Sequence, residues 1–205
     1  MRTGTKIPPR PRGRPRSFDR DTVLGAASQR FRTHGFAATS LDELAEATGV
    51  NRPSLYAAFG DKRGIYLAAL ERTHDWVQKS FLGLRAAGLP VRPMLERMFA
   101  FTIDIYRSGE LGPSGCIALN TATAEAVTDP HIRAALERIL DLEDREIEAA
   151  LAEAGSPAPR AHANIVTSVL HSLSIRARAG TPRETLDRVA ADCVDLIAGG
   201  PGRGA

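Results

Sequence analysis

Residues 40–59 read SLDELAEATGVNRPSLYAAF, and this stretch decides the fold. Ser40 followed by Glu43 forms a capping box, in which each side chain can accept a hydrogen bond from the other residue's backbone N–H. The apolar positions of the short helix that follows are Leu41, Leu44 and Ala45. After a glycine-containing turn, Asn51 caps a second short helix, where Pro53 occupies the first turn and costs no hydrogen bond. The pattern predicts a helix-turn-helix.

In such a unit the first helix crosses the DNA backbone, and the second places its N-terminal residues against base edges in the major groove. Leu55 and Phe59 of the second helix would face inward. The outward residues are Arg52, Pro53, Ser54, Tyr56 and Ala57. The spacing alone also fits an ordinary helical hairpin with an exposed arginine and tyrosine.

The outward residues differ in what they offer to DNA. Arg52 suits a bidentate contact with guanine, whereas Pro53 and Ala57 offer only apolar contact, for example to a thymine methyl group. Ser54 and Tyr56 carry hydroxyls suited to phosphates. Lys62, at the start of the next predicted helix, is a further phosphate candidate.

Helical periodicity continues through the rest of the chain, and no stretch has the period of a strand. We expect an all-α protein of about nine helices. The expected segments are 19–35, 41–48, 52–59, a longer helix capped by Asp61, about 94–108, 116–126, 130–154, 161–179 and 182–198. We divide the chain into a disordered basic arm (1–16), a DNA-binding domain with the helix-turn-helix (17–77), and a helical ligand-binding and dimerisation domain (78–200).

Charge is concentrated at the N-terminus. Residues 1–20 contain seven Arg and Lys residues against Asp19, a net charge of +6, which leaves −3 for the remainder of a chain whose total is +3. A basic arm on a slightly acidic body suits a polyanionic partner such as nucleic acid. A solubilising disordered tail would have the same composition.

Several classes of protein are disfavoured. The N-terminus has no apolar segment and no run reaches the roughly 20 apolar residues of a membrane span, so we expect no membrane partner. Two distant cysteines, Cys116 and Cys193, form no disulfide scaffold, which favours a reducing cytoplasm. The chain has no catalytic motif and its five histidines are scattered. We therefore expect no enzyme activity, no cofactor and no metal site.

Residues 17–77 resemble the DNA-binding domain of the TetR family of transcriptional regulators. The matching features are Val23-Leu24-x-Ala26-Ala27, Phe31, Gly35-Phe36, Thr39-Ser40-Leu41-Asp42-Glu43-Leu44-Ala45, Thr48-Gly49-Val50, Ser54-Leu55-Tyr56, Phe59 and Lys62. The resemblance implies a homodimer on a palindromic operator in double-stranded DNA, usually a repressor released by a small molecule. It also implies that Thr39, Ser40, Tyr56 and Lys62 hold phosphates, while Arg52, Pro53 and Ser54 face bases. Ala57 departs from the family, which often has a larger side chain there.

The basic arm carries its own motif. Arg12-Gly13-Arg14-Pro15-Arg16 resembles an AT-hook core, in which arginines enter a narrow A·T minor groove. The plainer interpretation is a mobile arm in which Arg12 and Arg14 make non-specific phosphate contacts.

The C-terminal half carries the expected dimerisation and sensing functions. The last two helices can pair with their copies in a four-helix interface. One stripe of the last helix fits that use, or can form the subunit's own core. Its members are Leu186, Val189, Ala190, Cys193, Val194 and Ile197. An effector pocket is expected between the helices after residue 76. Candidate lining residues, each of which could instead be plain core, are Trp76, Phe99, Ile103, Tyr106, Cys116 and Asn120.

Cys116 has a second interpretation. The segments around Cys116 and residues 173–180 resemble the sensor domain of one TetR subgroup, some of whose members respond to electrophiles or oxidants. A cysteine at a helix N-terminus would have a lowered thiol pKa, which favours a reactive thiolate. The alternative is a small buried residue next to a tight turn.

Two further alternatives concern the function as a whole. A sequence-indifferent architectural protein could bind DNA through the basic arm, although the well-capped second helix argues against it. An activator would have the same sequence features as a repressor.

Overall fold

The computed structural model describes residues 18–199, and this part of the chain is helical with no strand. The helices are α1 Arg20–His34, α2 Leu41–Thr48, α3 Arg52–Phe59, α4 Lys62–Ala86, α5 Val91–Arg107, a π-helical segment Ala118–Ala122, α6 Thr123–Glu125, α7 Pro130–Glu153, α8 Pro159–Arg178 and α9 Arg183–Ala198. The predicted all-α fold of about nine helices is confirmed for these residues. The basic arm, with Arg12 and Arg14, lies outside them.

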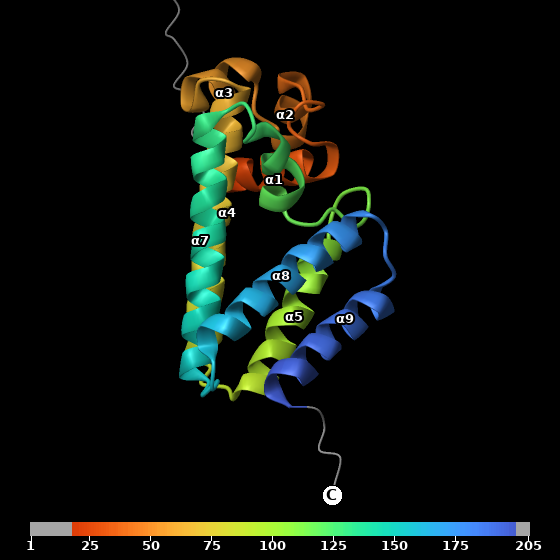
Figure 1. The fold of residues 1–205 in the computed structure, drawn as a ribbon. Helices are drawn as coiled ribbons and strands as arrows, with labels where there is room; N and C mark the ends of the chain where they lie inside the picture. Colours follow the sequence, from red (N-terminus) through yellow and green to blue (C-terminus); the bar gives the residue numbers. More distant parts are fainter. Residues whose placement is uncertain (1–17, 200–205) are drawn as a thin grey trace, which may run out of the picture.

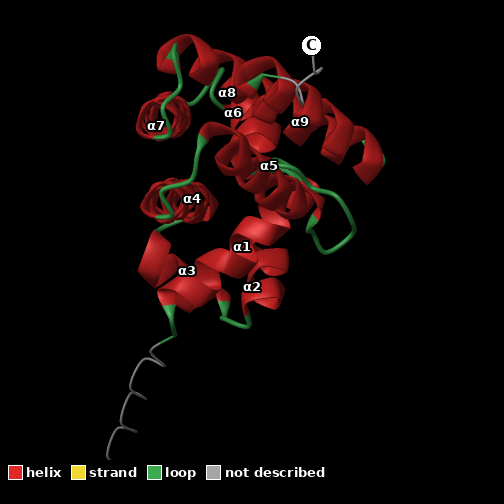
Figure 2. Ribbon diagram, turned by 90° about the horizontal axis from the view of Figure 1, so that it is seen from below, coloured by secondary structure: helices red, strands yellow, loops and turns green. Residues whose placement is uncertain are grey.

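Two long helices connect the two halves of the molecule. α4 and α7 lie side by side along their length (Figure 1). The small helices α1, α2 and α3 gather at one end of this pair, while α5, α8 and α9 pack beside the other end (Figures 1 and 2). α4 therefore begins in the N-terminal helical unit and ends in the C-terminal one.

Helix starts follow the capping residues in the sequence. Asp19, Ser40, Asn51, Asp61 and Asp129 each accept a backbone N–H of the first turn of their helix. These side chains satisfy donors that have no partner within the helix.

Two helices differ from expectation. α5 begins at Val91 and not near Met94, because Pro93 fits within the first turn, where its missing N–H breaks no bond. The helix expected at 116–126 contains the wider π turn. Its side chains are fixed on two sides, since Thr121 bonds to Tyr66 of α4 and Asn120 to Ser174 of α8.

The buried apolar side chains form two clusters. The first joins α1–α4 to the segment from Ile117 to Ile139, so the N-terminal half of α7 shares a core with the helix-turn-helix. The second joins the far half of α4 to α5, α8, α9 and the rest of α7. The helix-turn-helix is thus packed directly against the C-terminal half of the chain.

The α9 stripe belongs to the second cluster. Leu186, Ala190, Cys193, Val194 and Ile197 are all buried within the subunit, and Val189 packs against them. Of the two interpretations of this stripe, the structure supports the subunit's own core, because α5 and α8 already cover it. Among residues 18–199, no helix is long and apolar enough to cross a membrane.

Candidate nucleic-acid interface and effector cavity

The capping box at the start of α2 is complete. The Ser40 N–H donates to the Glu43 carboxylate over 2.7 Å, and the Glu43 N–H donates to the Ser40 hydroxyl over 3.2 Å. Arg30 of α1 also donates to the same carboxylate, over 2.8 Å. Chiefly through the Ser40 N–H, these contacts lower the pKa of Glu43 to about 2. The start of α2 is thereby fixed to α1.

α3 presents its N-terminal turn to solvent. The Asn51 side chain accepts the Ser54 N–H over 2.9 Å, while Leu55 is fully buried beneath the helix. The expected outward residues do face outward: Arg52, Pro53, Tyr56 and Ala57 are exposed and Ser54 is half-buried. This end of α3 is therefore both fixed and accessible.

The other end of α3 is held by residues that precede and begin α1. The Phe18 ring stacks on Phe59 with centroids 6.3 Å apart, and the Arg20 guanidinium lies 4.5 Å from the same ring. Arg20 also donates to the Ala58 carbonyl over 3.2 Å.

Two expected phosphate contacts have partners within the protein. Thr39 is 1% exposed and its hydroxyl donates to the Gly35 carbonyl, so its side chain is a buried turn residue, contrary to expectation. Lys62 donates to the Phe36 carbonyl over 3.0 Å, and its ammonium lies 4.3 Å from the centre of the Phe36 ring. Ser40 and Tyr56 remain exposed.

Arginines link the helix-turn-helix unit to the C-terminal half. Arg32, near the end of α1, donates to the carbonyls of Gly115, Ile105 and Ser108 over 3.0, 2.7 and 2.8 Å. In return Arg178 of α8 donates to the Arg32 carbonyl. Arg32 carried no distinguishing signal in the sequence, because its carbonyl partners lie far away along the chain. Arg178 falls within residues 173–180, but the resemblance of that segment to a sensor domain did not indicate its contact with Arg32.

A cavity of about 830 Å³ lies where α1, α4, α5 and α8 meet. Of the expected lining residues, Trp76, Tyr106 and Cys116 line it. Phe99, Ile103 and Asn120 do not: the first two are buried core, and Asn120 bonds to Ser174 and the Ser114 carbonyl. Two buried residues that the sequence did not indicate, Arg32 and Glu143, also line the cavity.

The Cys116 thiol does not have the expected lowered pKa. Burial raises the pKa of Cys116 to about 11, and the nearby Glu143 charge acts in the same direction. The backbone N–H groups of Leu119 and Ala118 at the helix start lower it, but by less than burial raises it. In the resting protein Cys116 is therefore a protonated thiol at neutral pH.

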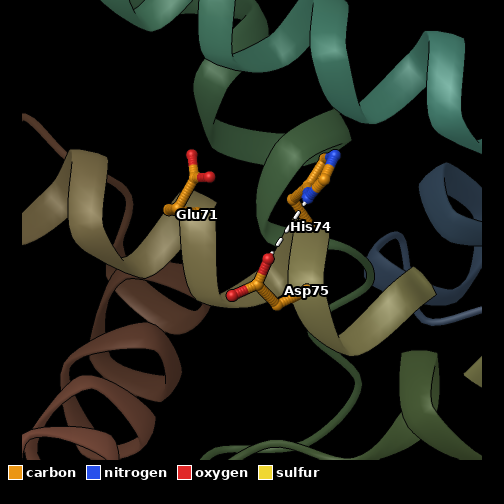
Figure 3. A group of neighbouring side chains, drawn as sticks. All are labelled: Glu71, His74 and Asp75. Atoms are coloured by element: carbon orange, nitrogen blue, oxygen red, sulfur yellow. Dashed lines mark hydrogen bonds and ion pairs between the residues drawn. The ribbon is translucent and has the colours of Figure 1, made fainter. Parts of the chain in front are cut away.

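Glu71, His74 and Asp75 of α4 bring three potential metal ligands within 4.8 Å of one another (Figure 3). Each acid already has a basic partner: Arg138 donates to Glu71 over 2.8 Å, and His74 lies 3.4 Å from Asp75. Both carboxylates are exposed. Because surface ion pairs account for the group, we assign no metal to it.

A helix-turn-helix on a helical domain with a ligand-sized cavity defines a ligand-responsive DNA-binding regulator. The family described as "Bacterial regulatory proteins, tetR family" matches residues 23–69. The HTH-type transcriptional repressor ComR of Escherichia coli (strain K12) is 32% identical over 193 residues, covering 90% of this chain and 91% of ComR. The repressor BdcR of the same strain is 29% identical over 195 residues, covering 94% of this chain and 96% of BdcR.

A solved structure is also similar. A cysteine mutant of the TetR family regulator CifR, complexed with 26 bp of double-strand operator DNA, has a TM-score of 0.71 and 29% identity over 88% of this chain and 98% of that one. The chain belongs to the TetR family of bacterial transcriptional regulators. It is a sequence-specific DNA-binding regulator.

Proposed function

We propose that the chain is a repressor that reads a palindromic operator with the first turn of α3 and leaves it when a small molecule fills the cavity. The observation that carries this proposal is the exposed, Asn51-capped start of α3 with Arg52 at its tip. In this arrangement Arg52, Pro53 and Ser54 face bases, and Arg52 reads guanine. The names of ComR and BdcR support repression, and a DNA-binding regulator of a bacterium acts in the cytoplasm.

Phosphate contacts would come from both sides of α3. Ser40 and Tyr56 have exposed hydroxyls, and an ammonium has three N–H donors, so Lys62 can bind a phosphate while it keeps its bond to Phe36. Arg12 and Arg14 would add minor-groove or phosphate contacts, and this stays a prediction about residues beyond the described ones.

The dimer would use the outward face of α8 together with α9. Ile165 and Ile175 of α8 are 37% and 59% exposed, and Ser168 lies between them on the same face. Leu196 of α9 is 70% exposed. Small and apolar residues on paired helices suit a four-helix interface, which would place two copies of α3 about one or more helical turns apart on DNA.

The test is a titration against the DNA upstream of the chain's own gene, with excess bulk DNA present. We expect a palindromic site that the wild type binds and bulk DNA does not compete away. Arg52→Ala should lose about tenfold or more of this affinity, since a bidentate arginine–guanine contact contributes roughly 1–3 kcal/mol of discrimination. Weak binding that bulk DNA abolishes and Arg52→Ala leaves unchanged would contradict the proposal.

A further inference from the structure

Positively charged side chains outnumber acidic ones in the lining of the cavity. Its acids each have a neighbour with a basic group: Asp104 pairs with Arg183 over 2.5 Å, and Glu143 lies 3.0 Å from the His171 ring, which carries a balancing charge only when protonated. Among its cations, Arg72 pairs with Asp21 over 2.8 Å. The remaining lining cations are Arg32, Lys79 and Arg97.

Lys79 and Arg97 lie on the two helices at the entrance, α4 and α5 respectively. Within residues 18–199 neither side chain makes a hydrogen bond or an ion pair, and both residues are exposed. Between the same helices the Trp76 and Phe101 rings stack with centroids 5.9 Å apart, and these rings are 40% and 51% exposed. The entrance therefore combines aromatic surface with two cations.

Arg32 is a cation inside the cavity wall, only 9% exposed. Its partners in the described residues are neutral oxygens: three backbone carbonyls and the Gln29 amide, with no carboxylate among them. Burying a guanidinium without an opposite charge is costly, and burial lowers the pKa of Arg32 accordingly. Of its five N–H donors four are used, which leaves one on the Nη1 atom.

The remainder of the lining is mostly apolar. Val77, Met98, Ile117 and Leu170 contribute to it, and a volume of about 830 Å³ accommodates an organic molecule. A ligand that matches both the apolar lining and the unpaired cations has an apolar body and a negative charge.

We propose that the cavity binds an amphipathic organic anion, with its acid group held by Arg32 and its entry favoured by Lys79 and Arg97. This proposal rests on the proposed function, because it names the class of effector for the same cavity. A carboxylate and a guanidinium form short charge-assisted hydrogen bonds, which the neutral carbonyls cannot match.

The same contact explains how the ligand would act on DNA binding. Arg32 belongs to α1, which packs against α2. Its carbonyl partners belong to the last turn of α5 and to the segment that follows α5. A ligand that draws the guanidinium away from these carbonyls changes how α1 is held against the C-terminal half. By linkage, the factor by which the anion weakens operator binding equals the factor by which operator weakens anion binding.

The experiment uses the emission of Trp76, the single tryptophan of the chain, which lines the cavity. The full-length protein is titrated with decanoate, 1-decanol and decyltrimethylammonium, which share a chain and differ in charge. We expect decanoate to bind at least tenfold more tightly than either of the others.

Variants of the lining cations test whether Arg32 holds the acid group of the bound anion. Arg32→Gln should weaken decanoate binding about tenfold and leave decanol binding within twofold. Arg145→Gln removes an exposed arginine of α7 outside this cavity and should change neither. If Arg32→Gln does not fold, the double variant Lys79→Gln/Arg97→Gln tests the proposal instead. It should weaken the binding of decanoate and leave the binding of decanol unchanged.

Equal binding of the three probes, preference for decyltrimethylammonium, or binding of none of them would overturn the proposal. An operator titration of the same preparations separates this result from failure of the proposed function. Intact operator binding without anion preference refutes only the ligand class, whereas wild-type protein that ignores the operator refutes the proposed function itself.

Discussion

The Arg52 guanidinium lies 3.1 Å from the Asp42 carboxylate, so the side chain proposed to read guanine is paired with an acid of the preceding helix. Both side chains are well exposed, 51% and 75% respectively. Exposed ion pairs contribute only about 0 to 1 kcal/mol, so Arg52 can leave Asp42 for DNA at little cost. The pair positions Arg52 at the tip of α3 without fixing it there.

Asp42→Asn should therefore tighten binding to the operator by a few fold. The substitution frees Arg52 and removes a negative charge from a surface that approaches phosphates. Fluorescence anisotropy with operator and with bulk DNA, at one salt concentration, measures both affinities. Glu46→Gln removes the same charge from the exposed α2 surface, and Glu46 forms no ion pair or hydrogen bond with Arg52. An equal gain in both variants would mean that charge alone, and not the release of Arg52, causes the effect.

The capping box gives a prediction for stability. Ser40→Ala removes the acceptor for the Glu43 N–H and should destabilise the protein by about 1 kcal/mol. For a chain of this size that corresponds to a fall in Tm of about 3 °C, measurable by circular dichroism. Ser40→Thr keeps a hydroxyl and should retain most of the stability, so similar losses in both variants would contradict a capping role.

The same capping box predicts how the stability of the protein depends on pH. The folded-state pKa of Glu43 is lowered to about 2, chiefly by the Ser40 N–H, from an ordinary value near 4.5. The ionised Glu43 carboxylate therefore stabilises the folded protein fully above about pH 4.5, and this stabilisation is lost as the pH falls toward 2. Glu43→Gln keeps an acceptor but does not titrate. Its Tm should therefore fall less than that of the wild type between pH 4.5 and pH 2, and parallel curves would refute this assignment.

Position 115 requires glycine for two reasons: its backbone has a positive φ, and neighbouring atoms leave no space for a Cβ. It has φ of +66°, and a Cβ there would lie 1.9 Å from the Asn120 amide nitrogen and 2.8 Å from the Ser174 carbonyl oxygen. Gly115→Ala should lower the Tm sharply and loosen the segment that Arg32 contacts. Gly155→Ala is the matched control, since its φ of +85° carries the same backbone penalty with no atom within 4 Å. That penalty alone is about 1–2 kcal/mol. Equal losses in the two variants would show that the contacts at Gly115 contribute nothing.

Short-range sequence patterns were sufficient to predict the helix-turn-helix. The bonds of Ser40 to Glu43 and of Asn51 to Ser54 span three residues, so the sequence contains both partners within one turn. Helix boundaries and the outward face of α3 follow from the same short-range pattern.

Contacts between distant residues were not predictable in this way. Arg32 and Glu143 have the sequence pattern of ordinary charged positions on amphipathic helices. They become cavity walls only through contacts between distant parts of the chain, of α1 with the end of α5 and of α7 with α8. The α9 stripe shows the corresponding limit for apolar residues. Periodicity indicates which face of a helix is buried but not whether the subunit or its copy buries it.

The last prediction concerns the reactivity of Cys116. Because burial raises the pKa of its thiol to about 11, only a very small fraction of the molecules carries the thiolate at pH 7. Alkylation by maleimide, followed by mass spectrometry in a Cys193→Ala background, should be roughly a hundredfold or more slower at pH 7 than for a thiol of ordinary pKa near 8.5. The rate should rise about tenfold per pH unit up to pH 10. A rate that is fast at pH 7 and constant above pH 8 would instead establish a thiolate and restore the sensor hypothesis for Cys116. Glutathione under the same conditions provides the reference rate.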